Sequence, residues 1–181
     1  MYPALRRSVF GDLVSAVLLP RIRSVENLRN LISTLDGLQD VERAPLLDGF
    51  TTDDGELRML FNGPWLSIDR KNMDEFDEFN RLLEQAIACG RRWGHAPWVR
   101  AATRTRSAVL DEMLKRPYAA RDVVYETAEA MGWSDNLRDQ LASIAFNNKD
   151  YGEALRIWRE VLPQWKADEL GCILINDSQI V

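Results

Sequence analysis

The 181-residue chain is predicted to be all-α, and three observations support this. Apolar residues recur at helical spacing along most of the chain, and capping and stop residues separate these runs. The connections between the runs are only a few residues long, which favours antiparallel packing of successive helices. We therefore expect antiparallel helical hairpins, with an N-terminal helical region at 1–71 and a more regular region at 72–181.

Two helices are expected in the first forty residues. A stripe of apolar residues four apart indicates a helix that ends at Pro20: Leu5, Val9, Leu13 and Val17. The next helix begins after Ser24, a favourable N-cap, and runs to Leu35 with Gly37 closing it. Within the first helix, the apolar segment from Val9 to Leu19 contains Asp12 and is too short and too polar to span a bilayer.

Residues 40–71 contain an irregular segment with two interpretations. Asn62-Gly63 between two apolar runs is the local signal of a tight β-hairpin. The same residues suit a short helix from Asp53 to Phe61, stopped by the glycine and proline that follow. The helix is favoured because the neighbouring segments are helical and isolated hairpins are weak.

Five further helices are expected from residue 72 onwards. Capping residues or prolines mark their starts, at Asn72, Pro97, Pro117, Ser134 or Asp135, and Asp150. Their expected ends are Arg92 before Gly94, Lys115, Gly132, the turn before Asp150, and Pro163. In the last helix, Leu155, Trp158 and Leu162 are expected to face inward.

The helices between about 98 and 163 show an internal correspondence. A shift of about 34 residues, a repeat length typical of helical hairpins, places Ala108 on Ala142 and Ala120 on Ala154. Small residues at matching positions are expected where helices cross closely.

Residues 137–163 resemble a tetratricopeptide repeat. The matching positions are Leu141-Ala142, Asp150-Tyr151, Ala154 and Trp158, and the departures are Arg138, Ala145 and Pro163. Residues 101–134 match only in spacing and in the two alanines. The resemblance implies an α–α superhelix over 72–181. Two hairpins rarely stand alone, so either the other helices cap the stack or the chain is a segment of a longer array in a larger multidomain protein.

The resemblance also implies a protein-interaction, scaffold or sensor role, with another protein or a peptide segment as partner. The family's groove positions fall on Asn136, Asp139, Ser143 and Asn147 in the better repeat. In the weaker repeat they fall on Ala102, Thr105 and Val109. This groove is polar and nearly neutral.

An alternative is binding of nucleic acid or a phosphate ligand through the Arg/Trp-rich stretch 91–106. The candidate contacts are Arg91, Arg92, Trp98, Arg100 and Arg104. The net charge of −5 gives no global attraction to nucleic acid or to anionic membranes. A competing account pairs these arginines with the acidic helix start at 74–78, and the overall acidity favours it.

No residue pattern supports catalysis, so we expect a non-enzyme without cofactor or metal. His95 is the sole histidine and lies in a linker without a surrounding motif. The sequence contains no phosphate-binding glycine motif. Cys89 and Cys172 belong to no paired motif, which favours a reducing compartment, and the cytoplasm is the expected location.

Overall fold

The structure is a computed structural model that describes residues 22–49 and 54–161. The described residues are helical and contain no strand, which confirms the all-α prediction for them. The elements are α2 (Val25–Gly37), α3 (Asp40–Gly49), α4 (Asp54–Ser67), α5 (Met73–Arg92), α6 (Ala96–Ala108), the π-helical turn η3 (Val109–Met113), α7 (Pro117–Met131), α8 (Asp135–Asn147) and α9 (Tyr151–Val161). The helix expected to end at Pro20 lies outside the described residues, as do Leu162 and Pro163.

The predicted N-caps are formed by the expected side chains. Ser24 accepts a hydrogen bond from the backbone N–H of Asn27. Asn72 accepts one from the N–H of Glu75 at 3.2 Å, and its amide donates to the Glu75 carboxylate at 3.0 Å. Ser134 caps α8 in the same way. These contacts join residues three apart, so they could be recognised from local sequence.

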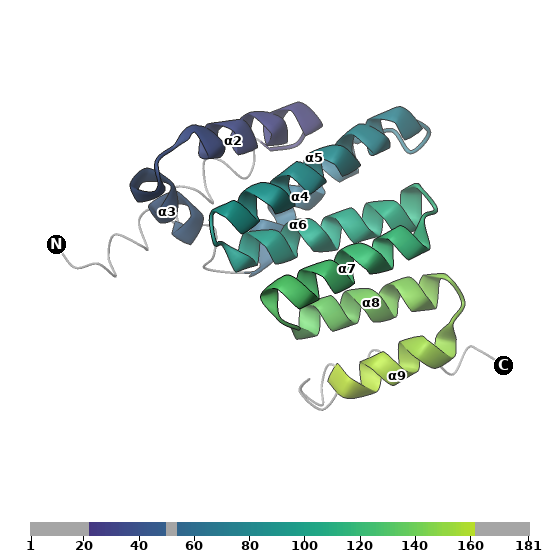
Figure 1. Cartoon of the computed structure of the whole chain (residues 1–181). Coiled ribbons are helices and arrows are strands. Elements are labelled where there is room, and N and C mark those ends of the chain that lie inside the picture. The colour runs from purple at the N-terminus through teal and green to yellow at the C-terminus, as the bar shows by residue number, and fades with distance from the viewer. Residues whose placement is uncertain (1–21, 50–53, 162–181) are drawn as a thin grey trace.

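Helices α5 to α9 form an antiparallel stack in which each helix lies beside its neighbour in the chain (Figure 1). Helix α4 also packs on α6. As a result, the turns 68–72, 114–116 and 148–150 lie at one edge of the stack (Figure 1).

Two of these turns each contain a lysine with a positive φ. Lys115 has a φ of 54° and Lys149 a φ of 65°, both in the left-handed region that L-residues seldom occupy. The two lysines are 34 residues apart, and so are the helix ends on each side of them. The helix ends around these two lysines therefore repeat with the period that the alanine pairs suggested.

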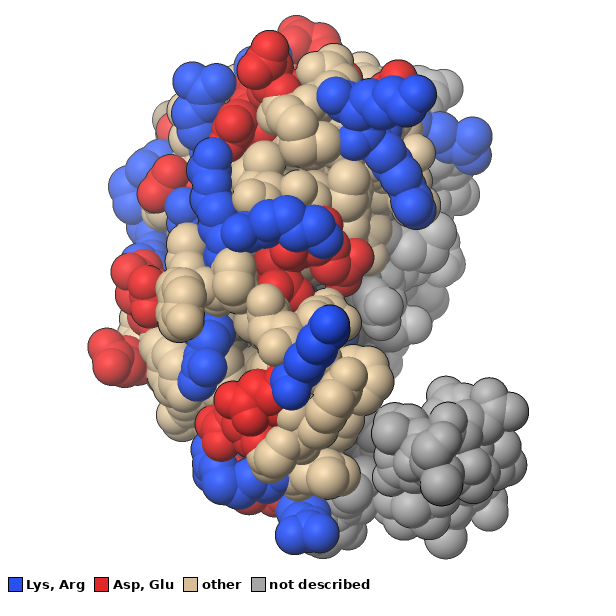
Figure 2. Space-filling view, turned by 90° about the vertical axis from the view of Figure 1, so that its right-hand side faces the viewer, with Lys and Arg blue, Asp and Glu red and all other residues tan. Residues whose placement is uncertain are grey.

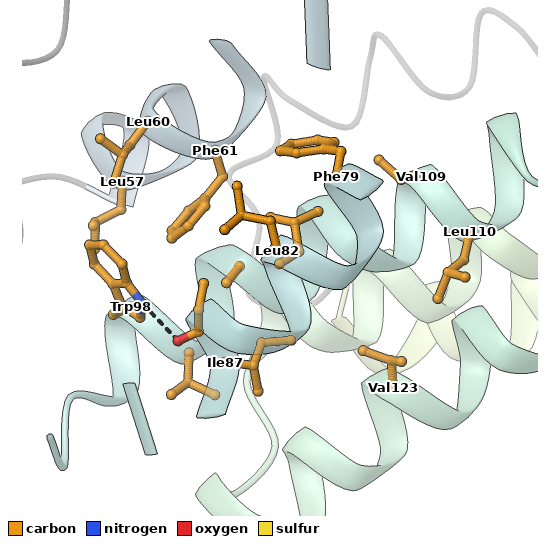
Figure 3. Packing of buried hydrophobic residues seen from close by; sticks show 14 of the residues in the cluster. Leu57, Leu60, Phe61, Phe79, Leu82, Ile87, Trp98, Val109, Leu110 and Val123 are labelled. Carbon is orange, nitrogen blue, oxygen red and sulfur yellow. Dashed lines mark hydrogen bonds between the residues drawn. The ribbon is translucent and has the colours of Figure 1, made fainter. Parts of the chain in front are cut away.

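The buried residues form one hydrophobic cluster that extends from Ile22 to Ile157. Trp98 lies fully buried within it, against Leu57 and Phe61 of α4 (Figure 3). Its indole N–H donates to the backbone oxygen of Ala86 at 2.9 Å, so its polar atom is satisfied (Figure 3). The ring of Trp98 packs edge to face on that of Phe61, with the two ring centroids 5.0 Å apart. The cluster contains residues from both sides of position 72, the expected boundary between the N-terminal region and the more regular region.

The segment 40–71 contains α3 and α4 in its described residues, and the hairpin interpretation is wrong. The favoured helix is present, but it continues past Gly63 and Pro64 to Ser67. Burial of Leu57 and Phe61 against the core outweighs the one backbone hydrogen bond that Pro64 removes. A Cβ at residue 63 would lie 2.6 Å from the backbone oxygen of Ile22, so glycine allows this close approach.

One expected inward-facing residue of α9 lies on the outside. Leu155 is 43% exposed, whereas Ala154, Ile157 and Val161 form the buried face. The helix is thus rotated by about one residue relative to the expected orientation, because the small Ala154 takes the closest contact. Trp158 is partly buried, as expected.

Candidate functional site

Two predicted groove residues of α8 contact the preceding hairpin, one through α6 and the other through η3. Asp139 accepts a hydrogen bond from the indole of Trp158 at 3.1 Å and lies 3.9 Å from the Arg104 guanidinium. Asn147 donates its side-chain amide to Asp111 at 2.9 Å. The structure therefore brings a residue of the predicted groove, Asp139, together with a residue of the predicted basic stretch, Arg104.

The remaining predicted groove positions differ between the two hairpins. Asn136 and Ser143 are partly buried on α8. The equivalent positions on α6 and at the start of η3 are buried, and they are Ala102, Thr105 and Val109. The Thr105 hydroxyl donates to the Asn62 side-chain oxygen of α4 at 2.8 Å, so α4 covers this face of α6. The expectation that these residues line an open groove is wrong.

The Arg/Trp-rich stretch does not form a single patch. Trp98 is fully buried, so the prediction that it stacks on a ligand is wrong. Arg100 donates to the backbone oxygen of Met131 at 3.1 Å, where a cation offsets the negative end of the α7 dipole. Arg92 turns the other way and pairs with Asp36 of α2 at 2.7 Å. Arg91 is exposed.

Three arginines of the stretch pair with acids, but not with those at 74–78. Arg106 pairs with Glu84 at 3.2 Å, and Arg92 and Arg104 have the partners given above. The acidic helix start instead binds Arg116, through Asp77 at 3.1 Å, and Arg29, through Glu78. In each of these ion pairs the two residues lie on different elements, so the pairing depends on how the helices pack.

His95 acts as a helix cap. Its ring Nδ1 accepts a hydrogen bond from the backbone N–H of Trp98 at 3.1 Å at the start of α6. No group of three or more potential metal ligands occurs among the described residues. Nor is any described helix both long and apolar enough to cross a membrane.

A pocket of about 1000 Å³ opens at the edge where the three turns lie. Figure 2 views the molecule from this side and shows Lys and Arg intermingled with Asp and Glu. The C-terminal parts of α4, η3 and α8 form the pocket wall together with the turn residues. Its apolar lining residues are Trp65, Leu66, Ile68, Phe76, Met113 and Pro117, and its polar ones are Asn62, Arg70, Asp111, Glu112, Lys115, Asn147 and Asn148.

The π-helical turn η3 contributes the acidic part of this wall. The N–H of Leu114 donates to the oxygen of Val109 at 3.0 Å, the wider spacing that defines a π-turn. Such turns are frequent at functional sites because they re-aim the side chains that they carry. Asp111 and Glu112, both within η3, line the pocket.

Asp111 is only 6% exposed, and two amides of α8 hold its carboxylate. Asn147 donates to Oδ2 at 2.9 Å and Asn148 to Oδ1 at 2.7 Å. The Asn148 amide also donates to the backbone oxygen of Ile144, which fixes its orientation. Burying a carboxylate is unfavourable unless hydrogen bonds or a counter-charge compensate it, and here the described partners are neutral amides.

Glu112 has a raised pKa. The residue as a whole is exposed, but burial of its carboxyl in the pocket wall raises the pKa, and the neighbouring Asp111 charge raises it further. Lys115 and Arg70 act in the opposite direction.

Sequence reasoning missed Asp111, Asn148 and Leu66 as site residues. The only local signal was an acidic pair inside the apolar run 109–113. The contact between Asp111 and Asn147 joins residues 36 apart, so the sequence shows neither the π-turn nor the two amides that meet it.

The arrangement provides a pocket lined by both polar and apolar residues, which suits binding of a side chain. Comparison of the chain with protein-family models, with curated proteins and with solved structures found no match. The geometry of the pocket and the internal repeat are therefore the basis for assigning a function.

Proposed function

We propose that this chain is a non-catalytic protein-interaction module of tetratricopeptide-like hairpins that binds a peptide segment of another protein. The repeat assignment is supported by the matching helix ends and the two left-handed lysines, Lys115 and Lys149. It is also supported by the burial of Ala120, Ala142 and Ala154, the small residues expected at close helix crossings. A scaffold or sensor segment of a cytoplasmic protein is the corresponding role.

The pocket at the turn edge carries the proposal. It is lined by the ends of three helices that occupy equivalent places in the stack, α4, η3 and α8. Its rim includes Leu66, which is 85% exposed and thus presents apolar surface to solvent. An exposed apolar side chain beside a polar pocket is a typical docking arrangement for a peptide.

The test is affinity capture from a native lysate, done with and without nuclease. The proteins captured by two variants of the chain are compared. Leu66→Glu places a charge on the pocket rim, and Val41→Glu places the same charge on α3 at a residue 75% exposed. We expect a discrete protein that survives nuclease, is retained by Val41→Glu and is lost with Leu66→Glu.

Two results would count against it. Capture that collapses on nuclease treatment would favour the nucleic-acid alternative, through exposed basic residues such as Arg91. A partner retained equally by both variants would remove the pocket from the binding site.

A further inference from the structure

We propose that the pocket receives an arginine side chain of the partner peptide, with the Asp111 carboxylate as its counter-ion. This rests on the proposed function and names the chemistry that the pocket selects. The inference starts from an ionisable group that is more than nine-tenths buried and faces a solvent-accessible cavity.

Asp111 has no cationic partner in the part of the chain that the structure describes. Its two hydrogen bonds come from the amides of Asn147 and Asn148. The ion pairs of the neighbouring arginines, Arg104 and Arg106, go to Asp139 and Glu84. Buried carboxylates are normally paired or bound to a cation, so a ligand cation would complete this charge.

The hydrogen-bonding capacity of Asp111 suits a guanidinium group. Each carboxylate oxygen accepts one described amide bond, and a carboxylate has about four lone-pair sites in all. The remaining lone pair on each oxygen matches the two parallel N–H groups of an arginine, which bind carboxylates in a bidentate way. The ammonium of lysine, a single point charge, matches this pair of acceptors less well.

The two amides also preorganise the site. They fix both oxygens of Asp111 before a ligand arrives, and the bond from Asn148 to Ile144 fixes one amide in turn. A ligand therefore meets a carboxylate whose orientation needs no further ordering. Trp65 and Leu66, which also line the pocket, provide apolar surface for the methylene groups of the arginine and for the next peptide residue.

The pocket also contains two basic residues, Arg70 and Lys115, and both lower the pKa of Glu112. They favour an acidic or carboxylate-bearing peptide as the competing ligand class, and the experiment separates the two.

Selection of a phage-displayed random peptide library on the full chain tests the proposal. We expect enriched peptides to share an arginine next to an apolar residue. In a synthetic version of an enriched peptide, replacing that arginine by the neutral isostere citrulline should weaken binding roughly tenfold or more, because the buried charge pair is lost. The Asp111→Asn variant should weaken binding of the arginine peptide by a similar factor, and bind the citrulline peptide nearly as the parent does.

The citrulline comparison uses the parent chain, so it decides the question even if Asp111→Asn fails to fold. Enriched peptides without a basic residue, or with an acidic residue in its place, would overturn the arginine assignment but leave the peptide-binding function standing. Absence of any enriched peptide would count against the proposed function and against this inference with it.

Discussion

Gly90 shows how a single residue determines the distance between two helices. It lies on α5 where Trp98 and Val99 of α6 pack against it. A Cβ there would lie 2.5 Å from Cδ1 of Trp98 and 2.8 Å from a methyl carbon of Val99. Both side chains are fully buried, so neither has free space into which it can move.

We therefore expect Gly90→Ala to lower the free energy of unfolding by about 1 to 3 kcal/mol, the usual cost of overpacking a core. Gly37→Ala on α2 is the matched control, since nothing lies within 4 Å of its added methyl group. The control should be neutral or slightly stabilising, because alanine favours the helix over glycine. Urea unfolding of both variants measures the difference, and equal midpoints would contradict the close packing at Gly90.

Glu112 gives a prediction for pH dependence. Burial and the Asp111 charge raise its pKa in the folded state, so the folded chain binds this proton more tightly than the unfolded chain does. As pH rises from the ordinary glutamate pKa through the raised value, the folded state loses this advantage and becomes less stable.

The Glu112→Gln variant removes this titration. Its free energy of unfolding, measured relative to the parent, should therefore increase as pH rises from the ordinary glutamate pKa through the raised one. Urea unfolding at several pH values measures this, with Glu126→Gln on the exposed face of α7 as a control for loss of one charge. A stability difference that stays constant across the range for Glu112→Gln would show that the carboxyl is not buried as described.

At the scale of the helix, Ala154 determines how α9 docks on its neighbours. It is fully buried, and the larger Leu155 beside it points outward. The position corresponds to Ala120 of α7, which is also fully buried. Small residues at both places allow the helix axes to approach closely.

Ala154→Leu is accordingly expected to destabilise the chain by about 1 to 3 kcal/mol, because the added atoms have no space. Ala130→Leu, at an exposed position of α7, is the matched control and should change stability little. Thermal unfolding followed by circular dichroism measures both. Similar melting of the two variants would show that α9 does not pack through this alanine, and would weaken the tetratricopeptide-like alignment.

At the scale of the whole molecule, one buried cluster joins the described helices from Ile22 to Ile157. Neighbouring helices in the stack share this cluster, so loss of one exposes apolar surface on the next. Trp98 lies inside it between α4 and α5, with its indole bonded to Ala86.

We therefore expect one cooperative unfolding transition. Tryptophan fluorescence, which includes the buried Trp98, and far-UV circular dichroism, which reports all helices, should give the same urea midpoint. In the Ala154→Leu variant both midpoints should move together, although α9 is remote from Trp98 in the stack (Figure 1). Separate midpoints would show that the ends of the stack unfold independently of its centre.

The sequence by itself determined most of the helices and several of their ends, but not α3 or the continuation of α4 to Ser67. N-caps at Ser24, Asn72 and Ser134 and the apolar period of α5 depend on residues three or four apart, so they can be recognised without the fold. The all-α class follows from the same local patterns. The period of 34 residues was also visible, because each hairpin needs small residues at its crossings.

Only the tertiary structure decided the site. The partners of the arginines, the burial of Trp98 and the cover of α6 by α4 depend on residues far apart in the chain, such as Thr105 and Asn62, which are 43 positions apart. The π-turn at Asp111 and the amides that meet it bring together separate helices in the same way. Side-chain identity sets what each group can bind, but the packing of helices sets which group is nearest, and the binding pocket arises from that packing.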